Sequence, residues 1–124
     1  MGAEKLDGAG TQMMRTLEEG LMTVQTIHGM VERMGIEVKA QKSVGILPQQ
    51  IKRIAVTLQG QLKGQFGMIA DQVSGMILVA GRGGSEQIKL RSLRECVAQI
   101  RTAIEIAMTK VKEKHSEAIE LSPD

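Results

Sequence analysis

The amino-acid sequence predicts an all-α protein made of three long amphipathic helices. Apolar residues recur in alternating steps of four and three along most of the chain, which is the spacing of helices that pack side by side. Aliphatic side chains and nine methionines supply the core volume, and Phe66 is the only aromatic residue, whereas β-sheets favour aromatic and β-branched residues. The length of 124 residues is typical of one domain with one core.

The first helix is expected over about residues 11–35, after a flexible N-terminal leader of residues 1–10. Thr11 is a suitable N-cap for this helix. Its apolar or small seam comprises Met13, Leu17, Gly20, Val24, Ile27, Val31 and Met34. Residues 36–47 are expected to form a connector, because the residue before Pro48 is pushed away from helical geometry.

The second helix is expected to run without a break over about residues 48–80. Pro48 fits its first turn, where the missing amide hydrogen costs nothing. The seam of this helix comprises Ala55, Gln59, Leu62, Phe66, Ile69, Val73, Met76 and Ala80. At 1.5 Å per residue the helix would be about 50 Å long. The glycines of the turn at residues 81–85 are suited to end it and to reverse the chain.

The third helix is expected over about residues 86–118, with Ser85 as its N-cap, and residues 119–124 are expected to form a C-terminal tail. Its apolar face comprises Leu93, Val97, Ile100, Ile104, Ala107 and Val111. Because a short turn joins them, helices two and three should form an antiparallel hairpin. The long helices leave apolar edges open, so the sequence predicts a bundle completed by dimerisation. A monomeric three-helix bundle is the alternative.

A row of glycines marks the side of the second helix opposite its apolar seam. Each glycine in a helix interior costs about 0.5 to 1 kcal/mol relative to alanine, so close approach of another backbone is expected to offset that cost. We therefore predict a protein interface on this face. Its residues are Gly60, Gly64, Gly67, Asp71, Gly75 and Leu78.

No residue pattern indicates catalysis, a metal site or a cofactor. His28 lies near the apolar residues of the first helix and has no acidic neighbour directly after it, so a buried or interfacial histidine is expected; a histidine phosphotransfer module at His28 is the alternative. Cys96 lies among inward-facing residues and is expected to act as a small core side chain with a raised pKa. One cysteine excludes an intramolecular disulfide and agrees with a cytoplasmic location.

The charge balance indicates no particular partner, because 16 basic and 14 acidic residues leave a net charge of only +2. A second hypothesis places nucleic-acid contacts on the third helix, at Lys89, Arg91, Arg94 and Arg101. No stretch of the chain is sufficiently free of charge to predict a membrane span. The sequence thus favours a non-enzymatic homo-oligomeric scaffold, adaptor or assembly protein, with a second copy or another helical protein as its partner.

Overall fold

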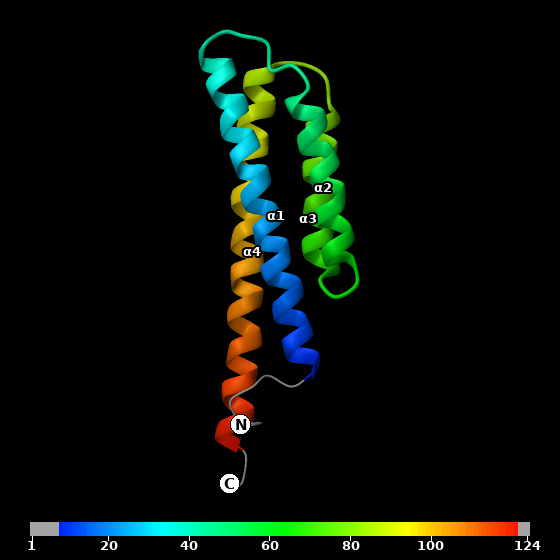
Figure 1. Cartoon of the computed structure of the whole chain (residues 1–124), viewed down its shortest axis with the longest axis vertical. Helices are drawn as coiled ribbons and strands as arrows, with labels where there is room; N and C mark the ends of the chain where they lie inside the picture. Colours follow the sequence, from blue (N-terminus) through cyan, green and yellow to red (C-terminus); the bar gives the residue numbers. More distant parts are fainter. Residues whose placement is uncertain (1–7, 122–124) are drawn as a thin grey trace.

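The computed structural model describes the backbone of residues 8–121 and the side chains of residues 8–114. Within residues 8–121 the chain forms four α-helices and no strand (Figure 1). The helices are α1 (Gly8–Lys39), α2 (Leu47–Lys63), α3 (Gly67–Gly81) and α4 (Glu86–Leu121). The all-α prediction is confirmed.

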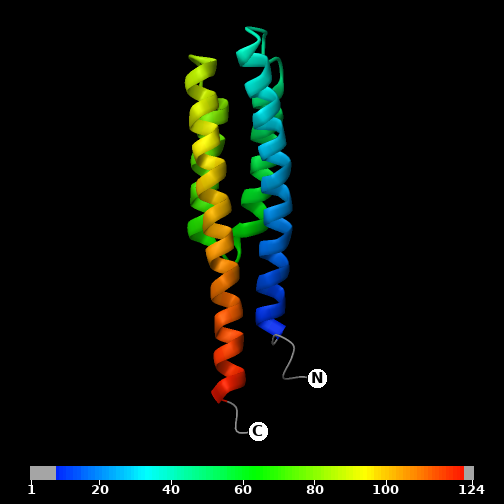
Figure 2. The same cartoon turned by 90° about the vertical axis from the view of Figure 1, so that its left-hand side faces the viewer.

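The four helices form an up-down-up-down bundle. Each helix packs against the next one along the chain, and α4 returns to pack against α1, as the two side views show (Figures 1 and 2). Short connections between sequential helices give this antiparallel arrangement its topology. The predicted antiparallel contact between the helices flanking residues 82–85 is therefore present, between α3 and α4.

The prediction of one helix over residues 48–80 is wrong, and so is the count of three helices. The chain reverses between Lys63 and Gly67, and α2 and α3 pack against each other as a hairpin. Gly64 and Gly67 bracket the reversal, and glycine is the weakest helix former after proline. Phe66 leaves helical geometry with φ −131° and ψ 62°, while its amide donates to the carbonyl of Leu62 at 2.7 Å.

The other helix boundaries differ less from expectation. Residues 8–10, expected in the leader, begin α1, so Thr11 lies inside the helix and is not its N-cap. Residues 36–39, expected in the connector, continue α1, and Leu47 of the same connector begins α2. Gly81, expected in the turn, ends α3, and residues 119–121, expected in the tail, continue α4. The rest of the predicted leader and tail, residues 1–7 and 122–124, lies outside the described residues. Ser85 caps α4 as predicted, because its Oγ accepts the amide hydrogen of Ile88 at 3.3 Å.

The end of α1 is closed by a pair of backbone hydrogen bonds. The amide of Lys42 donates to the carbonyl of Glu37 at 2.9 Å, and the amide of Gln41 donates to that of Val38 at 3.0 Å. This is the Schellman arrangement, which needs one residue in the left-handed conformation. Gln41 takes that position with φ 59°, although glycine is the usual residue there.

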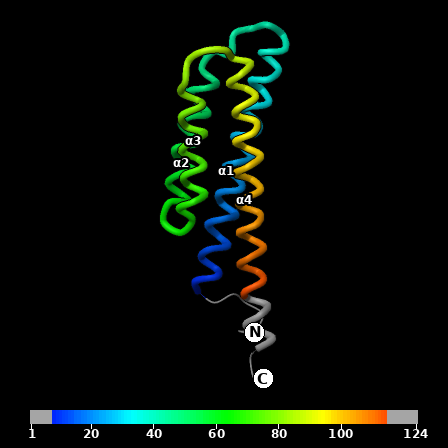
Figure 3. Tube along the Cα trace, turned by 180° about the vertical axis from the view of Figure 1, so that it is seen from behind, coloured from blue at the N-terminus to red at the C-terminus, as the bar shows by residue number. Residues whose placement is uncertain are grey.

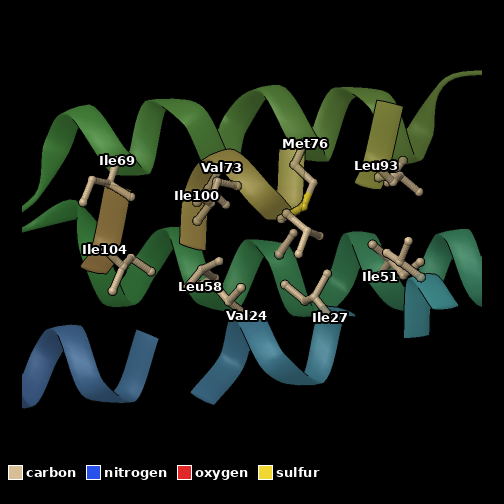
Figure 4. Packing of buried hydrophobic residues seen from close by; sticks show 14 of the residues in the cluster. Val24, Ile27, Ile51, Leu58, Ile69, Val73, Met76, Leu93, Ile100 and Ile104 are labelled. Carbon is tan, nitrogen blue, oxygen red and sulfur yellow. The ribbon is translucent and has the colours of Figure 1, made fainter. Parts of the chain in front are cut away.

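Aliphatic side chains from all four helices fill one continuous core (Figure 4). Among the residues with described side chains, no polar or charged residue is buried. The largest fully buried side chains are Leu17, Ile27, Met34, Ile51, Leu58, Leu62, Met76, Leu93, Ile100, Ile104, Val24 and Val31. At the edge of this core, polar side chains form hydrogen bonds between neighbouring helices. The Thr23 hydroxyl donates to Gln61 at 2.9 Å between α1 and α2, and the Gln59 amide donates to the Ser74 hydroxyl between α2 and α3.

The helices differ in length by about a factor of two, and this sets the shape of the molecule. α1 has 32 residues and α4 has 36, against 17 in α2 and 15 in α3. Gly20 lies opposite Leu62 in the last turn of α2 and Ile104 of α4. Beyond that level α1 and α4 continue as a pair past the hairpin turn (Figures 1 and 3). We call this part, residues 8–19 and 105–121, the stalk.

Along the length of α2 and α3, one chain therefore forms a complete four-helix bundle. None of the helices in residues 8–121 has the length and apolar character needed to cross a bilayer.

Candidate interaction surfaces

The predicted glycine interface does not lie along one helix. Gly60 is on α2, Gly75 is on α3, and Gly64 lies in the turn between them just before Gly67 opens α3. All six predicted interface residues are exposed, on α2, on α3 or in the turn between them. A Cβ atom added at any of the four glycines would meet no atom within 4 Å. No part of residues 8–121 lies close to these four glycines in a way that their lack of a side chain would permit, so a contact here would involve something outside the described residues.

Close approach occurs instead at two glycines of α1. A Cβ on Gly20 would lie 3.2 Å from Leu62 Cδ2 and 3.7 Å from Ile104 Cδ1, so this glycine allows α2 and α4 to pack closely against α1. A Cβ on Gly35 would lie 2.5 Å from the Arg94 guanidinium. Arg94 crosses α1 at that point and binds both carboxylate oxygens of Glu32, at 3.1 and 3.2 Å.

The structure places His28 on the exposed surface of α1, so the expectation of a buried histidine is wrong, while an interfacial one stays a prediction. His28 lies in the middle of the helix, one turn before Glu32. Among the residues whose side chains are described, no three His, Cys, Asp or Glu side chains converge in a way that could hold a metal ion.

Cys96 is half-buried on α4 and packs against the edge of the core. Burial, and to a smaller extent the negative charge of Glu95, raises the pKa of its thiol. The raised pKa agrees with the prediction from sequence. Because the thiolate is the reactive form, these surroundings disfavour a nucleophilic role.

The four basic residues proposed for nucleic acid do not share one face of α4. Because consecutive residues are about 100° apart around a helix, Lys89 points between about 120° and 160° away from the other three. Arg94 is already bound to Glu32 across the α1–α4 contact, at 3.1 Å between Nε and Oε2. Lys89 and Arg101 are half-buried, and Arg91 is exposed. Arg91, Arg94 and Arg101 lie within about 80° of one another around α4, so the nucleic-acid hypothesis stays a prediction that rests on these three residues.

The stalk is a surface that the sequence alone did not indicate. Met14 and Val111 are buried and Leu17 is fully enclosed, so the seams of the bundle continue into the stalk. Met13 and Ala107 are half-buried and pack against the same core. The stalk follows from the shorter lengths of α2 and α3 compared with α1 and α4. A prediction of one helix over residues 48–80 contains no such difference in length.

A shallow depression on α4 is lined by Thr102, Glu105, Ile106, Thr109, Lys110 and Glu113. All six residues belong to one helix, so no second element closes the depression into a binding cleft.

The surfaces described above therefore stand on their own geometry, because no family model, curated protein or solved structure matches this chain.

Proposed function

We propose that this chain is a non-enzymatic helical scaffold or adaptor of the cytoplasm that works as a homo-oligomer. The observation that carries the proposal is the stalk, in which two core-forming helices continue beyond the pair that covers them. A second copy placed antiparallel, with its own stalk against the first, supplies the two missing helices. The contact has two-fold symmetry, which is the commonest arrangement of homo-oligomers.

The seam residues of the stalk support this proposal. Met13 and Leu17 on α1, and Ala107 and Val111 on α4, continue the four-and-three spacing of the bundle. Leu17 and Val111 are already buried within the chain, so the apolar surface that a partner would remove from water is that of Met13 and Ala107, with a gain of about 25 cal/mol for each Å² buried. The exposed glycine face of the α2–α3 hairpin is a second contact surface, suited to another helical protein because it is small and weakly charged.

The mass of the protein in solution tests the homo-oligomer. The chain mass is 13.5 kDa, so we expect light scattering to give about twice that value, with little dependence on salt because apolar contacts hold the dimer. The double variant Met13→Glu and Ala107→Glu places two carboxylates on the half-buried side of the stalk and should give the monomer mass.

A matched control carries the same changes at exposed positions outside the stalk, Met22→Glu and Ala98→Glu. Both side chains are exposed, so this variant should keep the mass of the wild type and the same helix content. A wild-type protein that is monomeric at tens of micromolar, or a control that dissociates as readily as the stalk variant, would reject the stalk as the interface.

The exposure of His28 supports a second candidate function, histidine phosphotransfer. Such a role needs an accessible imidazole on a bundle helix, and the side chain meets that requirement. The carboxylate of Glu32 one turn away would repel a phosphoryl group, which weighs against it. Incubation with acetyl phosphate tests the role: an acid-labile phosphate that is absent from His28→Gln would establish it, and an unlabelled wild type would remove it.

A further inference from the structure

The fold gathers positive charge at one end of the molecule. Residues 40–46 connect α1 to α2, and residues 82–85 connect α3 to α4. Both connections lie at the same end of the bundle (Figure 1). We define the connector end as residues 36–53 and 81–91. It contains seven basic and two acidic residues, a net charge of +5. The remaining residues with described side chains have eight basic and seven acidic residues, a net charge of +1.

The basic side chains of the connector end are free to meet an anionic partner. The seven residues are Lys39, Lys42, Lys52, Arg53, Arg82, Lys89 and Arg91, and all except Lys89 are exposed. The ion pair between Arg94 and Glu32 is the only one among the described side chains, so none of the seven is neutralised by a carboxylate contact. The Lys52 side chain lies beside Gly81, the last residue of α3, with its Nζ 3.4 Å from where a Cβ on that glycine would be.

Exposed isoleucines lie among these charges. Ile36, Ile46 and Ile88 are 66%, 62% and 64% exposed, and each belongs to a different element around the connector end. No core contact of this chain requires a large apolar side chain at these exposed positions. The connector end therefore combines exposed cationic and exposed apolar side chains.

We propose that the connector end binds an anionic phospholipid surface, with the bundle standing on the membrane and the stalk pointing away from it. Stable peripheral attachment requires two contributions, one from basic residues and one from apolar insertion, and this end supplies both. A nucleic acid would use the charge but not the isoleucines, and it stacks its bases on aromatic side chains. The only aromatic residue, Phe66, lies in the turn at the opposite end of α2.

The proposal goes beyond the scaffold function and does not depend on the stalk. Membrane attachment of this kind does not require a spanning helix. Each Lys or Arg close to an anionic surface raises the affinity by roughly fivefold, so seven of them outweigh the small net charge of the whole chain.

Flotation with vesicles tests the proposal. The wild-type protein should float with phosphatidylcholine vesicles that contain about one-third phosphatidylserine and not with phosphatidylcholine alone. The triple variant Lys42→Glu, Arg53→Glu and Arg82→Glu should lower the affinity by about a hundredfold or more. The control Lys63→Glu with Gln25→Glu, Gln65→Glu, Gln72→Glu and Gln99→Glu makes the same change in net charge at exposed positions outside the connector end and the stalk, and it should bind within a few-fold of the wild type.

A second pair of variants tests the apolar contribution. Ile46→Gln and Ile88→Gln together should lower the affinity by roughly tenfold, through loss of apolar contact with the acyl region. Met22→Gln and Met68→Gln alter exposed apolar residues outside the connector end and the stalk and should leave binding unchanged. All four changes are at exposed positions, so circular dichroism should show the same helix content in both double variants.

Four outcomes would overturn the proposal. The first is absence of flotation at low salt, and the second is equal binding to vesicles with and without phosphatidylserine. The third is an equal loss of binding in the two charge variants, since that would reflect net charge rather than the connector end. The fourth is tighter binding to a short RNA or to polyglutamate than to the vesicles, since that would assign the surface to a nucleic acid or to an acidic protein segment.

Discussion

At the scale of single residues, Gln41 holds the least favourable backbone conformation that the structure describes outside glycine. Its φ of 59° lies in the left-handed region, where side chains with a Cβ lose about 1 to 2 kcal/mol. The position closes the Schellman motif at the end of α1, so the conformation is required by the hydrogen bonds of Lys42 and Gln41 itself.

Replacing this residue with glycine should therefore stabilise the protein. We expect Gln41→Gly to raise the free energy of unfolding by about 0.5 to 1 kcal/mol, because glycine takes the left-handed conformation without steric cost but gains entropy in the unfolded chain. Urea unfolding followed by circular dichroism measures the change. Gln41→Val should destabilise the protein, and a stabilising effect of valine would contradict the assignment of strain to this position.

The thiol of Cys96 gives a prediction about pH. Burial first, and then the charge of Glu95, raises the pKa of this thiol, so the thiolate forms at higher pH in the folded protein than in the unfolded chain. The associated stability is present below the pKa of the unfolded thiol and is lost as pH rises through the pKa of the folded one.

Alkylation by iodoacetamide should accordingly have its pH midpoint at a higher pH in the native protein than in urea. Glu95→Gln should lower the native midpoint by removing the smaller of the two causes and should leave the midpoint in urea almost unchanged. Coincident pH profiles for native and unfolded protein would show that the thiol is not shielded by the fold.

At the scale of the helices, the sequence indicated most of the fold because heptad spacing identifies helices reliably. The seam of α1 from Leu17 to Met34, the cap at Ser85 and the first turn at Pro48 are found as predicted, whereas Met14 rather than Met13 is the buried residue at the start of that seam. The sequence does not predict the break in the second helix, because the apolar residues keep the same four-and-three spacing on both sides of the turn. Leu62 ends the buried row of α2 and Ile69 begins that of α3, seven residues apart, so the spacing continues across a chain reversal.

The glycines indicate the break between α2 and α3, although their spacing also fits one face of a continuous helix. Gly64 and Gly67 belong to the turn, whereas Gly60 and Gly75 face open space on separate helices. Periodicity reports which residues are apolar and not whether the chain continues in the same direction. The prediction that His28 is buried is wrong because apolar neighbours in the sequence do not place a residue on the buried side. Those neighbours lie on the inward side of α1, and His28 lies beside them on the exposed side.

The two kinds of glycine in these helices predict opposite effects for one substitution. Gly20→Leu should lower the free energy of unfolding by about 1 to 3 kcal/mol, because the added side chain enters space beside the buried Leu62 and Leu58. Gly60→Leu should raise it by about 0.5 kcal/mol or more, since leucine is the better helix former and nothing obstructs it. Thermal unfolding at one protein concentration compares the two directly.

If Gly60→Leu instead lowered both the stability and the mass seen by light scattering, the exposed glycine face would be an interface as the sequence suggested. An unchanged mass together with higher stability would leave the glycines as residues on a solvent-facing side of the hairpin. In either case the stability of Gly20→Leu reports packing inside the bundle alone.

At the scale of the whole molecule, the unequal helices divide the protein into a covered and an uncovered half. In the covered half every helix has two neighbours, and residues such as Ile51, Leu58 and Ile100 are essentially inaccessible to water. Past the hairpin turn, α1 and α4 of the stalk have only each other as neighbours (Figure 1), whereas Leu17, nearer the turn, is still fully buried. Amide exchange by local opening becomes easier where fewer apolar contacts must be broken, so the two halves should differ in protection.

Hydrogen exchange measured at two protein concentrations can separate the intrinsic opening of the stalk from its burial in a dimer. Amides of residues 8–16 should exchange faster than those of α2 at low concentration, because only α4 packs against that part of α1. If a second copy covers the stalk, protection of residues 8–16 should rise with concentration, since association stabilises the closed state by mass action, while residues 51–62 change little. The variant Met13→Glu and Ala107→Glu should lose the concentration dependence and keep the slow exchange of α2. Protection that is independent of concentration in the wild type would mean that the stalk remains a free pair of helices, and its contact with a different partner would then be the next interface to seek.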